Sequence, residues 1–340
     1  MKLISIFFVI TSLVNAYGQT VLHAVERKSE KKIDILHGDR LLTSFAWYDS
    51  VFKPVLYPIN TVGGTTVTRS YPFQLVPGER MDHPHQVGMF FTHESVNGHD
   101  FWNLSPRIPL KDRFRYGHIR LDHYEIHETG PGEIQLTALS FWTNYHADPV
   151  LEEVTTFLFS VKGNNFIIDR ATRLKALGNK VEFKDAKDAM LGLRLARALE
   201  MPNDWKEIYV NPDGTPGTEA IINNEGVTGS YRNSEGITGL DVWGKKAKWL
   251  QLSGIVAGKK VAVLVIDHPQ NPGYPTYWHA RGYGLLAANP LGTAIFTNNQ
   301  EHTNLVLPPG ESVLFRHRIL VHEGEPLADE EVGSFQFDRH

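Results

Sequence analysis

Four of the chain's 16 histidines lie in one short stretch, MDHPHQVGMFFTHESVNGHDFWN, at residues 81–103. Imidazole suits proton transfer because its ordinary pKa is near neutral pH, and it is also a common metal ligand. His83 and His85 are separated only by Pro84, which cannot donate a hydrogen bond within a central strand. We therefore expect this pair at a strand entrance and assign both residues as candidate catalytic groups. No cofactor is expected, but if a divalent metal is bound, these two histidines are its expected ligands.

The residues after this pair have the pattern of a strand. If residues 85–93 form one strand, alternation places five side chains on one face: His85, Val87, Met89, Phe91 and His93. His93 would then lie about 26 Å from His85 at roughly 3.3 Å per residue, so one metal could not bind both. His93 therefore need not belong to the same site.

Asp100 and Trp102 follow a predicted hairpin turn at Asn97-Gly98 and share one side of the next segment. A carboxylate beside an indole suits a sugar, because the ring stacks on the aromatic face while the acid accepts hydroxyl hydrogen bonds. We assign both as candidate substrate-binding residues. The alternative is that Trp102 belongs to the core and Asp100 caps a turn.

A second group of candidate residues lies in PTYWHARGYGLLAANPLG, residues 275–292. In extended geometry four large side chains face one way, backed by small residues: Tyr277, His279, Arg281 and Tyr283. His279 is a candidate general acid or orienting residue, and Arg281 would hold a carboxylate or a developing oxyanion in its planar fork. Tyr277 and Tyr283 are candidate substrate-binding residues, as are Glu301 and His302 in a loop nearer the C-terminus. The alternative is an ordinary exposed sheet face.

Period-two alternation dominates the rest of the chain, which predicts an all-β protein. Strands are expected at residues 133–146, 154–161, 165–177 and 260–267, separated by turns rich in Gly, Asn and Pro. We expect one domain, a large antiparallel β-sandwich of two sheets, over residues 19–325, followed by a C-terminal tail at 326–340. Residues 203–240 are rich in Gly, Asn, Pro and Thr and predict a long surface excursion.

The N-terminal sequence MKLISIFFVITSLVNAYGQT predicts a cleaved signal peptide over residues 1–18 and a secreted or periplasmic protein. No later apolar run is long enough to predict a membrane span. The chain has no cysteine, which excludes thiol catalysis, and its net charge of −4 argues against a nucleic-acid partner. The sequence also lacks the P-loop, GxGxxG, GxSxG and HExxH motifs.

Three ordered blocks carry a family resemblance: DHPHQVGMFFTHESVNGHDFW, DHPQNPGYPTYWHARGYGLLAANPLG and GESVLFRHRILVHEG. They resemble the signature blocks of a bacterial exported family of unknown function that bears the label "methane oxygenase PmoA". The closing strand, with its Pro-Gly-Glu turn, is similar to the end of galactose-mutarotase-like supersandwich domains. The resemblance implies an exported β-rich protein connected with carbohydrate use.

Together these patterns favour a carbohydrate-active enzyme, an epimerase, lyase or hydrolase, that acts on a sugar derivative through histidine acid/base catalysis. Two alternatives stay open. One is a metal-dependent oxygenase or hydrolase that uses the histidine cluster, and the other is a non-catalytic glycan-binding module. The expected partner is a carbohydrate or another small molecule.

Overall fold

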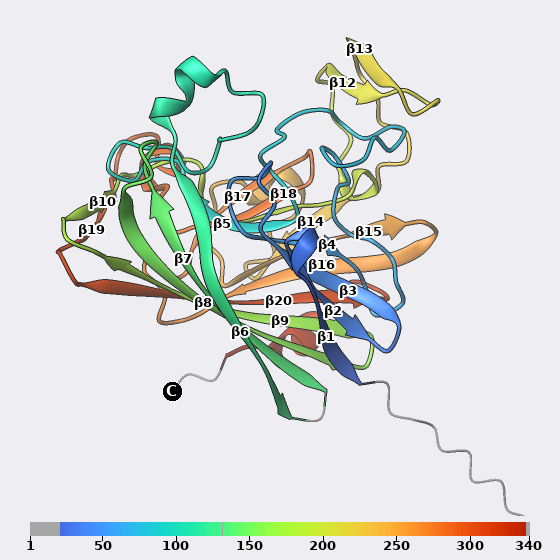
Figure 1. Cartoon of the computed structure of the whole chain (residues 1–340). Helices are drawn as coiled ribbons and strands as arrows, with labels where there is room; N and C mark the ends of the chain where they lie inside the picture. The colour runs from blue at the N-terminus through green and yellow to red at the C-terminus, as the bar shows by residue number, and fades with distance from the viewer. Residues whose placement is uncertain (1–20, 131, 338–340) are drawn as a thin grey trace, which may run out of the picture.

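Two large antiparallel sheets make up the protein in the computed structural model, which describes residues 21–130 and 132–337 (Figure 1). Sheet I has the order β1 (Leu22–Arg27), β2 (Lys32–His37), β3 (Arg40–Ala46), β4 (Val55–Ile59), β5 (Met89–His93), β11 (Ala189–Arg194), β18 (Leu285–Asn289) and β17 (Tyr277–Arg281). Sheet II has the order β14 (Ser230–Asn233), β15 (Trp249–Val256), β16 (Lys259–Asp267), β20 (Ser312–Glu323), β9 (Asn165–Ala176), β8 (Pro149–Lys162), β7 (Glu133–Thr143) and β6 (His118–Gly130). The predicted all-β, two-sheet antiparallel sandwich is confirmed.

The remaining elements are short. Two strand pairs stand outside the large sheets: β10 (Val181–Phe183) with β19 (Leu305–Leu307), and β12 (Glu207–Val210) with β13 (Pro216–Ile221). The helices are η1 (Lys28–Glu30), η2 (Leu110–Arg115), η3 (Arg197–Leu199), η4 (Gly239–Val242), α1 (Thr293–Phe296) and α2 (Asp329–Gly333). Among the described residues, no helix is long and apolar enough to cross a membrane. The predicted signal peptide lies outside the described residues.

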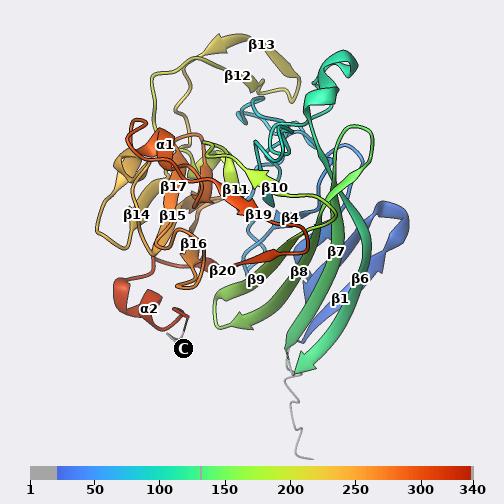
Figure 2. The same cartoon turned by 90° about the vertical axis from the view of Figure 1, so that its left-hand side faces the viewer.

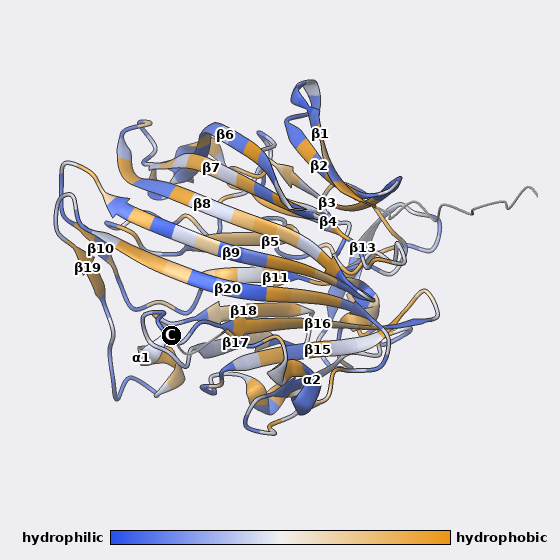
Figure 3. Ribbon diagram, turned by 90° about the horizontal axis from the view of Figure 1, so that it is seen from below, coloured by the Kyte–Doolittle hydropathy of each residue, from blue (hydrophilic) through white to orange (hydrophobic). Residues whose placement is uncertain are grey.

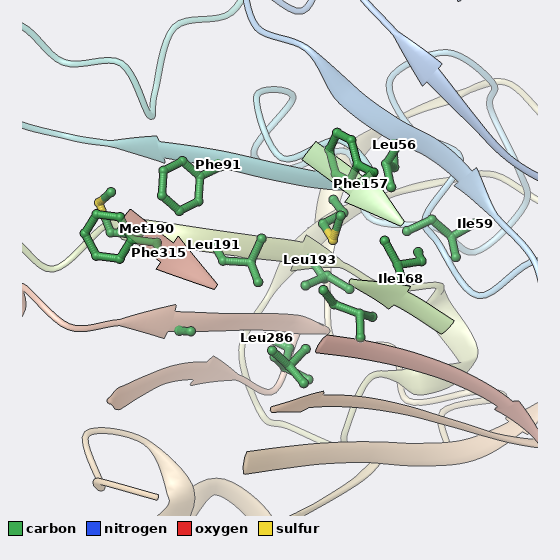
Figure 4. Packing of buried hydrophobic residues seen from close by; sticks show 14 of the residues in the cluster. Leu56, Ile59, Phe91, Phe157, Ile168, Met190, Leu191, Leu193, Leu286 and Phe315 are labelled. Atoms are coloured by element: carbon green, nitrogen blue, oxygen red, sulfur yellow. The ribbon is translucent and has the colours of Figure 1, made fainter. Parts of the chain in front are cut away.

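The alternation in the sequence produces the core. Along β8 every second residue is buried, and Figure 3 shows the corresponding change between apolar and polar residues along β8 and β9. Leu191 and Leu193 of sheet I face Phe157 and Phe315 of sheet II in one apolar cluster (Figure 4). Each such side chain contributes roughly 1.5–3 kcal/mol when it leaves water, so the inter-sheet layer is a major source of stability.

The strand predicted for residues 85–93 begins only at Met89, and its assignment of His85 and His93 to one face is wrong. Gly88 has a φ of +53°, and a Cβ atom there would lie 2.1 Å from the carbonyl oxygen of Leu56. The chain therefore bends at Gly88, and the alternation restarts after it. Val87 packs on the outer side of sheet I, whereas Met89 packs between the sheets.

The surface excursion predicted for residues 203–240 contains the β12–β13 hairpin and the edge strand β14. Figure 2 shows this hairpin at one end of the molecule and α2, near the C-terminus, at the other. In the tail, Leu327 and Val332 are buried in an apolar cluster with Trp249 and Leu264 of sheet II. This cluster attaches α2 to the sandwich.

Candidate functional site

The segment that contains His83 and the segment that contains Arg281 and Tyr283 meet on the outer face of sheet I. His83 stacks on Tyr283 with 5.0 Å between ring centroids and 17° between ring planes. The guanidinium of Arg194 lies 4.5 Å from the centre of the same tyrosine ring, and that of Arg281 lies 5.9 Å away. Segments almost 200 residues apart in sequence therefore share one site around Tyr283, as the sequence predicts for His83 and Arg281.

The pairing register of sheet I explains how β17 contributes. Trp278 and Ala280 pack into the inter-sheet core, so Tyr277, His279 and Arg281 project from the outer face. Across the sheet His279 lies opposite Ala287 of β18, and Ala287 lies opposite Gly192 of β11. The predicted shared face is confirmed for these three residues. Tyr283 reaches the same side from the turn between β17 and β18 instead of from a continuous strand.

Asp82 is the electrostatic centre of the site. Its Oδ1 accepts hydrogen bonds from Arg69 Nη1 and from Arg194 Nη2, the latter at 2.6 Å, and its Oδ2 lies 2.8 Å from His83 Nδ1. Burial alone would raise the pKa of the Asp82 carboxyl, but Arg194, His83 and Arg69 hold it well below its ordinary value. Asp82 is therefore ionised, and it fixes the orientation of the His83 ring.

The geometry of His83 leaves one ring nitrogen available. A carboxylate can only accept a hydrogen bond, so Nδ1 carries the hydrogen that faces Asp82, and Nε2 is the ring nitrogen that this contact leaves free. The side chain is 39% exposed, whereas its partner Asp82 is 9% exposed. His83 can therefore exchange a proton with a bound molecule while its other nitrogen stays held.

His85 lies beside His83 but in a different environment. The two rings meet edge to face at 5.5 Å, and His85 is only 7% exposed. Burial, together with the charges of Lys53 and His83, lowers the pKa of His85 well below its ordinary value, so the ring is neutral. Its Nε2 has no hydrogen-bond partner within the described residues. A buried unpaired nitrogen is unfavourable, so it would gain from a ligand hydroxyl.

His279 is held from both sides. Its Nδ1 accepts a hydrogen bond of 3.1 Å from Trp243 Nε1, and its Nε2 lies 3.4 Å from Asp188 Oδ1. Burial, followed by the charges of Arg281, Lys187 and His83, lowers the pKa of His279 to about 3. The imidazole is therefore neutral at physiological pH, with its hydrogen on Nε2, facing Asp188. Of the two predicted roles, general acid and orienting residue, this arrangement favours the second.

Asp188 belongs to a carboxyl pair that the sequence analysis missed. Glu94 Oε2 accepts a 2.9 Å hydrogen bond from the Asp188 backbone N–H, where the ends of β5 and β11 meet. Burial and the neighbouring Asp188 charge raise the pKa of Glu94 to about 7. One sequence signal for Glu94 is available. It directly follows His93, so alternation places its side chain on the outer face of sheet I, opposite to that of His93. Nothing in the sequence connects it to Asp188.

The prediction for Trp102 is wrong, because its side chain is fully buried beside Phe90 and cannot stack on a sugar. The carboxylate of Asp100 accepts hydrogen bonds from the backbone N–H groups of Trp102 and Asn103, at 2.8 and 2.9 Å. It also accepts one from the Asn103 side chain. The alternative, in which Trp102 belongs to the core and Asp100 caps a turn, therefore describes the contacts of both residues.

The other predicted substrate-binding residues lie at the margin. Tyr277 packs against Phe296 at 5.2 Å, and burial together with the charge of Glu301 raises its pKa. Glu301 and His302 are exposed, and within the described part of the chain neither side chain makes a hydrogen bond or ion pair. No contact in that part of the chain joins these three residues to Asp82 or His83.

The described residues contain no group of three or more His, Asp or Glu side chains arranged to hold a metal ion. Arg69, Arg194 and Gln86, which the sequence analysis did not select, instead complete the polar site. Gln86 Oε1 accepts a 2.7 Å hydrogen bond from Arg194 Nη1. The site is therefore built mainly from imidazole, carboxyl and guanidinium groups.

Several solved structures are similar to this chain. The galactosidase domain of the α-galactosidase–sucrose kinase AgaSK is 12% identical, with a TM-score of 0.39 and a match that covers 89% of this chain and 42% of that one. This chain thus spans about two fifths of that protein. The Slr1438 protein from Synechocystis sp. PCC 6803 is 10% identical, with a TM-score of 0.31 and coverage of 89% and 96%. A galactose mutarotase related enzyme from Lactobacillus acidophilus is 8% identical, with a TM-score of 0.30 and coverage of 91% and 100%. Because these TM-scores are low, we draw no functional inference from them.

Among curated proteins no match was found. A family model does match, over residues 32–335, and its description is "family of unknown function (DUF6807)". The description names no activity and does not carry the methane-oxygenase label. Since the match covers most of the sequence and includes every site residue described above, the chain belongs to the DUF6807 family of unknown function.

Proposed function

We propose that this protein is an exported enzyme that acts on a sugar derivative by acid/base catalysis on the outer face of sheet I. The observation that carries the proposal is the His83–Asp82 pair, in which a partly exposed imidazole is oriented by a buried carboxylate. An imidazole held in one tautomer by a carboxylate is a recurrent arrangement for a general base. His83 is the base in this proposal, and Asp82 is its positioning residue.

Glu94 is the proposed general acid. With a pKa of about 7 its carboxyl group is about half protonated at neutral pH, which suits a group that gives up and regains a proton. Asp188 maintains this state through its negative charge, and His279 orients Asp188 through the 3.4 Å contact. In this scheme the neutral His279 does not itself transfer a proton.

The substrate class follows from the groups left without partners. Within the described residues the Arg281 side chain makes no hydrogen bond and has no carboxylate within ion-pair distance, and its guanidinium lies 5.9 Å from the centre of the Tyr283 ring. A guanidinium fork of this kind binds a carboxylate well, and the free Nε2 of His85 suits a hydroxyl group. We therefore propose a sugar acid, whose α-proton becomes easier to remove once Arg281 neutralises the carboxylate. Epimerisation or elimination is then favoured over hydrolysis.

The test is incubation of the purified protein in D2O with a panel of free uronic acids, uronic-acid oligosaccharides and neutral oligosaccharides, followed by ¹H NMR. An epimerase would replace the α-proton by deuterium, a lyase would produce alkene signals, and a hydrolase would release new reducing ends. Substitution His83→Asn should lower the rate at least about 100-fold, which is the usual scale of a general base. The exposed His123, which also contacts a preceding aspartate, provides the matched control as His123→Asn. Equal turnover in the two variants would refute the role of His83.

A further inference from the structure

A basic segment with exposed apolar side chains, residues 106–116, projects from one end of the molecule. It contains the six-residue helix η2, and its blue-green ribbon lies at the top of Figures 1 and 2. Among the large apolar side chains of the described residues, Leu110 and Phe114 are the two most exposed, at 74% and 54%. Large exposed apolar side chains gathered in one place are typical of an interaction surface.

The charge of this segment differs from that of the whole protein. The chain has a net charge of −4, whereas residues 106–116 contain four basic residues and one acidic residue, a net charge of +3. Lys111 and Arg115 are exposed, and within the described part of the chain neither side chain makes a hydrogen bond or ion pair. The guanidinium of Arg115 instead lies 5.4 Å from the centre of the Phe114 ring. The segment therefore presents an aromatic side chain together with unpaired positive charges.

The β12–β13 hairpin lies at the same end of the molecule and has the opposite charge (Figures 1 and 2). Residues 203–226, which contain it, include five acidic residues and one lysine, a net charge of −4. They also carry the exposed apolar side chains of Trp205, Ile221 and Ile222, at 48%, 48% and 51%. No hydrogen bond or ion pair between described residues joins this hairpin to segment 106–116. The two surfaces have complementary charges that a single copy of the chain does not pair.

The hairpin also borders a hollow that can receive an apolar side chain. A cavity of about 770 Å³ lies where the hairpin meets residues 77–78 and 197–198. Ile221, Glu219 and Glu225 all contribute to its lining. Both glutamates are exposed, and in the part of the chain that the structure describes neither carboxyl group is paired with a cation. An aromatic side chain flanked by positive charges is the complement of such a cavity.

We propose that this end of the molecule binds a second copy of the chain, with segment 106–116 of each copy against the β12–β13 hairpin of the other. Phe114 enters the partner's cavity, and Lys111 and Arg115 face the carboxyl groups beside it. Because both surfaces lie at one end of the chain, a two-fold axis makes the contact twice and closes the assembly at two copies. An anionic membrane would attract the basic segment but repel the acidic hairpin, so a second copy fits both surfaces better.

The two docking surfaces are attached to the loop that carries the acid/base site. Arg107 Nη1 donates a 3.1 Å hydrogen bond to the backbone carbonyl of Met81, and the Met81 N–H donates one of 2.9 Å to the carbonyl of Ile208 in β12. Met81 directly precedes Asp82. The proposal does not rest on the proposed function, because self-association is measured without a substrate.

The first experiment measures the molecular mass of the protein by analytical ultracentrifugation over a wide range of protein concentrations, at low and at high salt. The unaltered protein should form a dimer that weakens at high salt, because salt screens exposed charges. Phe114→Ser should raise the dissociation constant at least about 10-fold, the usual scale for truncating an aromatic residue in an interface. Val306→Ser is the control, since Val306 is 45% exposed but lies in β19, and it should leave the constant unchanged. A monomer at every concentration would overturn the proposal.

A charge exchange tests the pairing itself. One variant combines Lys111→Glu with Arg115→Glu, the other combines Glu219→Lys with Glu225→Lys, and each should self-associate more weakly than the unaltered protein. A mixture of the two variants should form a heterodimer, since each positive surface then meets a negative one. The contrary result is a mixture that stays monomeric, or an unaltered protein that binds phosphatidylglycerol vesicles instead of itself.

Discussion

At the scale of single residues, the site depends on a buried charge balance. Arg69 and Arg194 are 1% and 0% exposed, and both donate to the carboxylate of Asp82. Two guanidinium groups in the interior need this anion, because an uncompensated buried charge is expensive. The carboxylate therefore supports the fold of the site as well as the orientation of His83.

Substitution Asp82→Asn should consequently destabilise the protein by about 3–5 kcal/mol, since it removes the anion and leaves both arginines buried. Urea denaturation followed by fluorescence would measure the change. Asp122 is a close control, because it also precedes and contacts a histidine but is 53% exposed. Asp122→Asn should change the free energy of unfolding by no more than about 0.5 kcal/mol. Equal effects of the two substitutions would contradict the assigned charge balance.

Glu94 predicts a pH dependence with a definite sign. Its pKa is raised from 4.5 to about 7, first by burial and then by Asp188, so the folded state holds this proton more tightly than the unfolded state. The contribution of Glu94 to stability is therefore full below about pH 4.5 and decreases as the pH rises to about 7. The measurement is the difference in melting temperature between the unaltered protein and Glu94→Gln. This difference should change between pH 4.5 and pH 7.5. A constant difference would argue against the shifted pKa.

At the scale of elements, small residues allow large ones to pack on sheet I. Gly192 of β11 has Phe90 and Trp102 directly above it, and a Cβ atom there would lie 2.5 Å from the phenylalanine ring and 3.1 Å from the indole. This contact also explains why the predicted exposure of Trp102 is wrong. The indole packs over Gly192, where any other residue would place a Cβ atom. No local sequence pattern around Trp102 reveals that space.

Substitution Gly192→Ala should lower stability by about 1–3 kcal/mol, because overpacking forces the two rings and the strand apart. Differential scanning calorimetry would give the shift. Gly178→Ala is the control, since a Cβ atom there has no neighbour within 4 Å. If both variants have the same melting temperature, the packing of Phe90 and Trp102 on β11 is not as described.

At the scale of the whole molecule, the sequence predicts the strands better than it predicts the site. Alternation at residues 133–146 and 165–177 corresponds to β7 and β9 because each strand has one face in the core. The Asp82–Arg194 contact joins residues 112 positions apart, and no periodic pattern encodes such a partner. His83, His279 and Arg281 could be predicted because their residue types are distinctive. Asp188 could not, because an isolated aspartate before a strand is ordinary.

The C-terminal segment belongs to this whole, because α2 closes an apolar cluster on sheet II. Val332 is fully buried there, so Val332→Ala should cost roughly 1–3 kcal/mol and move the entire unfolding transition. Circular dichroism and fluorescence should report the same lowered midpoint. The control is Glu330→Ala, because Glu330 lies two residues before Val332 in the same helix and is exposed. Loss of α2 alone, with an unchanged main transition, would show that the segment unfolds independently.

Arg69 has one further effect. Besides the carboxylate of Asp82, its guanidinium binds the backbone carbonyls of Asp82, His83 and Gln86. One side chain therefore holds the irregular loop of residues 82–86 in place. Such a loop does not need a ligand to become ordered. The imidazole of His83 is therefore already oriented before a ligand binds, and binding should proceed with little loss of chain entropy. Structures with and without a bound ligand should therefore superimpose closely over residues 82–86.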